Sequence, residues 1–476
     1  MTTTHCTTLF DDKRLDTRRL QLEQDFIQSQ NCSIHKTCQD YSAVRAAYRF
    51  LANDKVTEQA LAADLVNDCS DRVKGKDVIA FCDTSTLNID SHKSRLTDTT
   101  GLGPIGSTND YKHLGLLFHP ILVHERSSGA ALGISAVKLW SRSNKAIRKK
   151  SRRYETKDIV IEQKESIKWI DPCIESRDGV LRKANHITFV MDREGDIMEV
   201  LDRIPDQRTD VLVRVMHNRN VTTPDQGREK LYDYIARQSV AAKSTVEVKD
   251  RKRKKRTAEV DIRFAKCKLH WSQRQKVSYK NNPEGVEVTV IEVRETVHQG
   301  YDDEPPLIWR LITTKDIDTA EQAKEEVRIY EQRWRVEEFF KLLKSDGYNI
   351  ESTELTTGKA IRKLLLILMK TSIKILQLKA ARDGKTDMKV SDVFDQDEIE
   401  CLQIVNEQVS GNTQKQRNPY DPNNLGWATW IIARLGGWSE FYNKSRPPGN
   451  KTLMWGMDKF EGIMIGFNIS RKKDVC

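Results

Sequence analysis

Two short apolar segments of this chain each end on an aspartate, and this repeated pattern constrains the fold more than any other feature. Residues 78–82 (Val-Ile-Ala-Phe-Cys) precede Asp83, and residues 187–191 (Ile-Thr-Phe-Val-Met) precede Asp192. Runs of this length and composition predict buried strands. A carboxylate at the end of such a strand lies at the carboxyl edge of the sheet, where open α/β sheets usually hold their sites. The pattern therefore predicts an α/β fold with both aspartates at that edge.

A third apolar run, residues 211–213, ends on Arg214. Beyond it the sequence alternates between apolar and polar residues, chiefly over 245–309, which predicts a mostly β insertion at about 220–312. The segment 319–346 contains neither Gly nor Pro and predicts a long helix, and an apolar helix is expected after it.

These patterns predict three domains, with boundaries near residues 70 and 380. Residues 1–70 lack Gly and space apolar residues as helices do, with the bases Arg14, Arg18 and Arg19 interleaved. This domain is either a solvated helix bundle or a helical DNA-binding domain. Residues 71–380 form the α/β domain that contains both aspartates, and residues 381–476 form a helical C-terminal domain.

The charge balance favours a polyanionic partner. Lys and Arg number 79 against 69 Asp and Glu, a net charge of +10. The densest basic run, residues 249–256, is either a solvated loop or a loop that contacts phosphates. No signal peptide or membrane span is recognisable, and the nine cysteines form no CxxC pair. We expect a bacterial cytoplasmic protein that uses neither membrane nor zinc.

A third carboxylate lies in the predicted long helix. At 100° per residue, five polar side chains fall within about 80° of one another on one helical face. They are Tyr330, Arg333, Glu337, Lys341 and Lys344. One explanation is a salt-bridge ladder of spacing i,i+4, which contributes a few tenths of a kcal/mol. The other is a metal site, because Asp83, Asp192 and Glu337 offer the hard oxygen ligands that Mg²⁺ prefers.

The spacing of Tyr330, Arg333, Glu337 and Lys344 resembles the Y-(2)-R-(3)-E-(6)-K signature of the insertion-sequence-four family of DDE transposases. The segments that begin at Asp83 (Asp-Thr-Ser-Thr-Leu) and at Asp192 (Asp-Arg-Glu-Gly-Asp-Ile) resemble the first and second aspartate motifs of that family. Further similar stretches, at 47–50 and 432–437, extend the resemblance over nearly the whole chain.

The resemblance implies an RNase H-like catalytic core with a β insertion, flanked by an N-terminal domain that binds transposon-end DNA and a C-terminal domain that forms a homodimer. It implies Mg²⁺, replaceable by Mn²⁺, at Asp83, Asp192 and Glu337. It also implies cut-and-paste transposition: nicking, hairpin formation and opening, and strand transfer into target DNA. Trp309 corresponds to the residue that receives a flipped base, and Arg214 to an arginine near the hairpin. Without the resemblance, Trp309 reads as a core residue and Arg214 as part of a surface salt bridge.

Two other functions remain open at this point. The same fold could serve a DNA nuclease without strand transfer, or a catalytically silent DNA-binding protein that inhibits transposition. The three intact carboxylates argue against the silent protein.

Overall fold

The computed structural model describes residues 9–29, 31–38, 40–106, 113–143, 159–249, 255–272, 280–297, 305–439 and 447–473. The predicted basic loop at 249–256 falls largely outside these residues, since 250–254 are not among them. Within the described ranges, every helix is too short or too polar to span a bilayer.

The centre of the molecule is a mixed sheet. Its strands are apolar on both sides, and both faces of the sheet are covered. β1 (Asp77–Cys82) pairs in parallel with β6 (His186–Met191), which pairs in parallel with β7 (Thr209–Arg214). On its other side β1 pairs antiparallel with β4 (His113–Glu125), which pairs antiparallel with β5 (Ala131–Trp140). The resulting strand order is β5-β4-β1-β6-β7. The predicted strands at 78–82, 187–191 and 211–213 are thus present and adjacent.

The insertion extends this sheet instead of forming a separate one. β13 (Ile308–Thr313) pairs antiparallel with β7 and with β12 (Val286–Glu295), and β12 pairs with β11 (Lys255–Leu269). The remaining strands of the insertion are β8 (Asn220–Thr222), β9 (Arg228–Lys230) and β10 (Ala242–Lys249), with a short helix α8 (Leu231–Ala236) between β9 and β10. β2 (Ser85–Asn88) and β3 (Gly103–Ile105) pair with β4 at the opposite end of the sheet.

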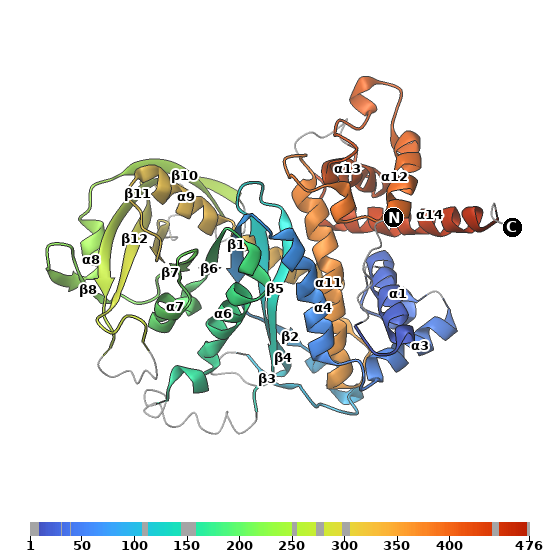
Figure 1. Ribbon diagram of the computed structural model, residues 1–476, viewed down its shortest axis with the longest axis horizontal. Helices are drawn as coiled ribbons and strands as arrows, with labels where there is room; N and C mark the ends of the chain where they lie inside the picture. The colour runs from blue at the N-terminus through green and yellow to red at the C-terminus, as the bar shows by residue number, and fades with distance from the viewer. Residues whose placement is uncertain are drawn as a thin grey trace.

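Helices flank the sheet and fill the space between its edge and the chain termini. α4 (Glu58–Arg72) and α6 (Asp171–Asp178) pack on β5, and the shorter α7 (Met198–Arg203) lies beside the insertion. The N-terminal region contains α1 (Lys13–Ser29), α2 (Ile34–Thr37) and α3 (Tyr41–Ala52). The C-terminal region contains α12 (Gln396–Val409), α13 (Leu425–Leu435) and α14 (Asn450–Lys473). Figure 1 shows these two regions on the same side of the molecule, away from the insertion.

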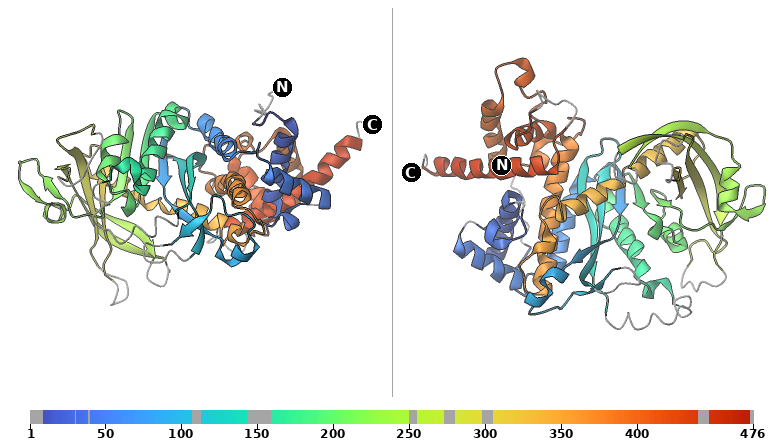
Figure 2. Two further views of the ribbon diagram at one scale, coloured as in Figure 1. Left: turned by 90° about the horizontal axis from the view of Figure 1, so that it is seen from below. Right: turned by 180° about the vertical axis from the view of Figure 1, so that it is seen from behind.

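One long helix, α11 (Gly358–Ala381), connects the regions. It packs against α1, α3 and α4, against β5, and against α13 and α14. The two views in Figure 2 place it between the sheet and the terminal helices. Most of its residues are buried, which explains the apolar stretch Leu364–Met369 at its centre.

The predicted helix at 319–346 is wrong in one respect, because two helices occupy this range. α9 (Ala320–Glu331) starts with a capping box of Thr319 and Gln322, and α10 (Trp334–Leu343) begins after a turn at residues 332–333. Arg333 therefore lies in the turn that caps α10 and not inside one continuous helix.

Candidate active site

Asp83 and Asp192 lie side by side because they follow two adjacent parallel strands in matching register. Phe81 of β1 is paired with Val190 of β6. Extending this register by two residues places Asp83 opposite Asp192. The sheet therefore brings the two predicted carboxylates to the same edge, as the sequence pattern indicated.

The Asp83 carboxylate is largely buried, with 17% of its side chain exposed. It accepts a hydrogen bond from the backbone N–H of Thr84 at 2.7 Å. It also forms an ion pair with Nη1 of Arg333 at 3.0 Å. Burial raises the pKa of Asp83 to about 6, and the negative charge of Asp192 adds to the rise, whereas Arg333 opposes it. Two partly buried carboxylates that disfavour each other's charge form a site that gains from a cation.

Asp192 caps a short turn of 3-10 helix at residues 193–195, where its Oδ1 accepts the backbone N–H of Glu194 at 2.9 Å. Burial raises the pKa of the Asp192 carboxyl, and the neighbouring charge of Glu194 contributes to the rise. The capping bond fixes the orientation of this carboxylate relative to its own loop.

Glu337 joins the aspartates through one arginine. The guanidinium of Arg333 donates to Oε1 of Glu337 at 2.7 Å while its other nitrogen contacts Asp83. Among the described residues, no three Asp, Glu, His or Cys side chains stand close enough together to enclose a metal ion. Arg333 instead pairs with Asp83 and Glu337 at the same time.

The donor set nevertheless fits a hard divalent cation. Asp83, Asp192 and Glu337 offer only carboxylate oxygens, and half of the Glu337 side chain is exposed and can turn away from Arg333. The single arginine between them neutralises one charge of three.

Tyr330, Arg214 and Trp309 form a second cluster next to the carboxylates. Tyr330, at the end of α9, is 5% exposed, and its hydroxyl is hydrogen-bonded to Arg214 of β7. The Trp309 ring of β13 meets the Tyr330 ring edge-on, with 5.6 Å between the ring centroids. Trp309 is only partly buried, and its ring is held at the surface by Tyr330.

The two lysines of the predicted helical face lie apart from each other. Lys341 is exposed on α10. Lys344, just after α10, donates to the backbone carbonyl of Thr86 in β2, and its ammonium lies 3.6 Å from Glu351. Lys344 thus ties the end of α10 to the strand that follows Asp83.

The three predicted arginines of the N-terminal region also differ. Arg14 is exposed, and Arg18 is partly exposed. Arg19 is buried, and its guanidinium lies 2.8 Å from both Glu23 and Asp64. Its charge is neutralised inside the protein, so the predicted contact between Arg19 and DNA does not fit its position.

Lys168 is a residue near the site that the sequence analysis did not single out. It is 7% exposed, and its Nζ lies 3.2 Å from Glu194, two residues after Asp192. No motif marks it, because its proximity to Glu194 arises from tertiary packing, in which the neighbouring Trp169 ring contacts His119 of β4.

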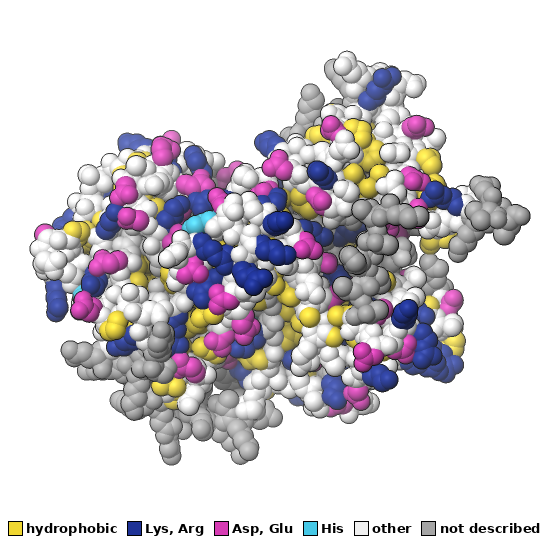
Figure 3. Space-filling view, in the orientation of Figure 1, with side chains coloured by type: hydrophobic (Ala, Val, Ile, Leu, Met, Phe, Trp, Pro, Cys, Tyr) yellow, Lys and Arg dark blue, Asp and Glu magenta, His cyan; other side chains and the backbone are white. Residues whose placement is uncertain are grey.

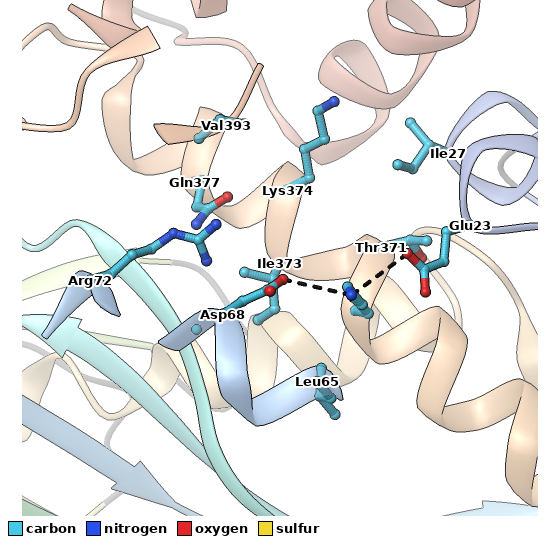
Figure 4. Close-up of a pocket in the computed structure, with 12 residues that line it drawn as sticks. Glu23, Ile27, Leu65, Asp68, Arg72, Thr371, Ile373, Lys374, Gln377 and Val393 are labelled. Carbon is cyan, nitrogen blue, oxygen red and sulfur yellow. Dashed lines mark ion pairs between the residues drawn. The ribbon is translucent and has the colours of Figure 1, made fainter. Parts of the chain in front are cut away.

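A cavity of about 180 Å³ lies apart from the carboxylates, between α1, α4 and α11. The Lys370 ammonium lies 3.8 Å from Asp68 and 3.7 Å from Glu23. Figure 4 shows these two carboxylates at the cavity. None of the predicted site residues lines this cavity.

Two family models match the chain. Residues 3–56 match a model described as transposase DNA-binding, and residues 169–372 match one described as transposase DDE domain. The first covers the N-terminal helices, and the second covers Asp192, Glu337 and the insertion. A DDE domain implies an RNase H-like core, and the strand order β5-β4-β1-β6-β7 provides the mixed sheet for it.

Proposed function

This chain is a DDE transposase that acts on DNA, and we propose that it cuts and joins DNA through Asp83, Asp192 and Glu337. The observation that carries the assignment is the adjacency of the first two at the edge of β1 and β6, with Glu337 linked to Asp83 by one guanidinium. The second aspartate and the glutamate both lie within the matched DDE domain.

DDE transposase domains use divalent metal ions, and we infer Mg²⁺, with Mn²⁺ as a substitute, at these three carboxylates. Bound ions of this kind supply Lewis acidity at the scissile phosphate. The chain itself contributes positively charged groups around the carboxylates. Arg333 and Arg214 can hold phosphate oxygens in fixed orientation, because a guanidinium presents its donors in a planar fork.

The reaction route is the one that the resemblance to the insertion-sequence-four family implies. Water nicks one strand, and the freed 3′-hydroxyl attacks the opposite strand and closes a hairpin. After the hairpin is opened, the 3′-ends join target DNA. The resemblance is with the transposase of transposon five (Tn-five) in particular. Trp309 is suited to stack on a base that leaves the helix, since Tyr330 supports one edge of its ring and the ring is partly exposed.

We assign DNA contact to the N-terminal region and self-association to the C-terminal region. Residues 3–56 match the transposase DNA-binding model, and Arg14, Arg45 and Arg49 are exposed there. Figure 3 shows basic side chains gathered over the area of α3. On this basis residues 1–70 hold the transposon end, 71–380 cleave it, and 381–476 form a homodimer that pairs two ends. A two-fold dimer supplies two equivalent sites, which two ends require.

The exposed apolar side chains of the C-terminal region support this assignment. Trp455, Ile465 and Ile469 of α14 are each at least 40% exposed, as is Ile404 of α12. Apolar side chains grouped in one region of the surface are typical of an interface.

A cleavage assay tests the function. Linear DNA that carries the element's own ends is incubated with the protein and Mg²⁺ or Mn²⁺, and products are resolved on a denaturing gel. We expect nicks and hairpins from the wild type and their loss in Glu337→Gln, which keeps the shape of the side chain but removes its charge. The loss should exceed about 100-fold, because a metal ligand is lost.

The alternatives give different products. A nuclease would nick without forming hairpins or joined products, and a silent transposition inhibitor would bind without cutting. Cleavage that survived in Glu337→Gln would show that the active site lies elsewhere.

A further inference from the structure

The loops that carry Asp83 and Asp192 are each closed by a local hydrogen bond. Thr84 N–H donates to Asp83 at 2.7 Å, and Glu194 N–H donates to Asp192 at 2.9 Å. Each bond orients one carboxylate within its own loop. The distance between the two carboxylates beyond the ends of β1 and β6 therefore depends on contacts that cross from one loop to the other.

The first part of such a path starts at Thr84. Its hydroxyl Oγ1 lies 2.9 Å from Nδ1 of His119, which is fully buried on β4. The His119 ring meets the Trp169 ring edge-on, with centroids 4.8 Å apart and an interplanar angle of 83°. Trp169 is itself 1% exposed, so neither ring has room to change position.

The second part ends at Asp192. Lys168 precedes Trp169, and its ammonium lies 5.5 Å from the centroid of the Trp169 ring and 5.6 Å from that of Trp140. The same ammonium lies 3.2 Å from Oε2 of Glu194, whose N–H caps Asp192. A cation held against two aromatic faces keeps a defined position.

We propose that His119, Trp169 and Lys168 form a bridge between the Asp83 and Asp192 loops and set the spacing of the two carboxylates. They are positioning residues, since none of them contacts either carboxylate in the structure. The spacing in turn fixes the affinity of the site for a divalent cation. This inference rests on the proposed function, because it requires the two aspartates to hold that cation. Groups that orient metal ligands commonly change metal affinity about 10- to 100-fold when they are removed.

The charge of Lys168 allows positioning to be separated from simple electrostatics. Removing a cation near two carboxylates makes the site more negative and favours binding of a divalent ion. Removing a positioning contact lets the Asp192 loop move and weakens binding. The two explanations therefore predict changes of opposite sign for Lys168→Met, which keeps the length and apolar stem of the side chain.

A second variant tests the other end of the bridge without changing charge. Thr84→Val retains the shape of the side chain and the backbone N–H bond to Asp83, but it removes the hydroxyl that contacts His119. The bridge predicts that Lys168→Met and Thr84→Val each weaken Mn²⁺ binding about 10-fold. Lys168→Arg should restore the wild-type affinity, because a guanidinium can stack on the same rings and reach Glu194.

The experiment measures the binding of Mn²⁺ to the full chain without DNA. The electron paramagnetic resonance signal of free Mn²⁺ reports how much of the ion remains unbound. Lys363→Met is the matched control. Lys363 is equally buried, but its ammonium donates to the carbonyls of Leu51 and Asn53 at 3.0 and 2.8 Å. This control should lower the thermal unfolding temperature and leave the Mn²⁺ affinity unchanged.

The outcomes separate the two proposals. Wild-type protein that binds no Mn²⁺ would contradict the metal site itself and the function proposed from it. Wild-type binding that stays unchanged or becomes tighter in Lys168→Met and Thr84→Val would overturn the bridge alone.

Discussion

Arg14 and Arg19 stand five positions apart on α1, yet their surroundings are opposite. Arg14 has 91% of its side chain exposed and pairs with Asp12, whereas Arg19 has 5% exposed and lies between Glu23 and Asp64. Arg19→Ala leaves Lys370 as the cation facing both buried carboxylates. We expect this variant to lower the free energy of unfolding by about 3 kcal/mol, the usual cost of breaking a buried pair.

Arg14→Ala should leave the stability nearly unchanged, because an exposed ion pair contributes little. If Arg14 contacts a phosphate, the variant binds duplex DNA more weakly, and the slope of log affinity against log salt concentration falls by about 1. Denaturant unfolding and DNA titration at several salt concentrations measure both effects. A stable Arg19→Ala protein with weakened DNA binding would contradict the structural role of Arg19.

Site residues could be predicted where a pattern along the chain marks them. They could not be predicted where only tertiary packing brings residues together. Asp83 and Asp192 are marked by the apolar runs before them, and Glu337 by its spacing from Arg333. That Arg333 also reaches Asp83 could not be predicted, since 250 residues separate the two. The same limit applies to Lys168, which no pattern connects with Asp192.

At the scale of elements, α13 and α14 pack closely because glycines stand where they cross. A Cβ atom at Gly456 of α14 would lie 1.8 Å from the carbonyl oxygen of Ile432 in α13. We expect Gly456→Ala to destabilise the C-terminal region by about 2 kcal/mol, because the helices must separate. At Gly462, on the same helix, a Cβ would meet no atom of the described residues within 4 Å apart from its own turn of the helix.

Gly462→Ala is the matched control, and it should stabilise the helix by up to about 1 kcal/mol, since alanine restricts the unfolded chain more than glycine does. Thermal unfolding of the three proteins, with limited proteolysis of the C-terminal region, measures the difference. Equal behaviour of the two variants would show that the crossing tolerates an added methyl group.

Periodicity predicted whether most elements are helices or strands. It did not predict where one helix ends and the next begins, or which strands pair. The break between α9 and α10 falls at residues 332–333, which include neither Gly nor Pro. Backbone angles there remain near helical values, with φ −73° and ψ −9° at Gln332. The backbone N–H groups of Gln332 and Arg333 donate to carbonyls three residues back, at 3.1 and 3.0 Å. A small change of hydrogen bonding therefore ends one helix and begins the next without a residue that signals it. Likewise, alternation predicted β structure in the insertion but not the pairing of Leu311 with Arg214, which joins the strands of the insertion to β7 of the central sheet.

At the scale of the whole molecule, the sequence predicted three regions but not the contacts that hold these regions together. α11 contacts helices of both terminal regions as well as β5, so the buried residues of this helix pack against several elements at once. Sequence periodicity shows that such a helix is buried, but it does not show what covers each side.

The stability of the whole fold should depend on pH through buried histidines. His124 of β4 is 4% exposed, and burial lowers its pKa from 6.5 to about 3, with the charge of Arg335 adding to the effect. Above pH 6.5 both folded and unfolded chains hold the ring neutral. As the pH falls below 6.5, the unfolded chain takes up a proton that the folded protein excludes. The stability is therefore present above pH 6.5 and is lost as the pH falls toward 3.

His124→Gln removes this proton uptake and should make the protein less sensitive to acid. Between pH 8 and pH 5 the wild type should lose about 2 kcal/mol of unfolding free energy through His124, because 1.5 pH units lie between 6.5 and 5. The variant should lose less by that amount, even though removing the ring lowers its stability at pH 8. Denaturant unfolding of both proteins at the two pH values measures the difference, and the pH 8 comparison isolates the packing cost. Parallel pH dependence of the two proteins would mean that His124 is protonated within the fold, and that the Arg335 side chain moves away to allow it.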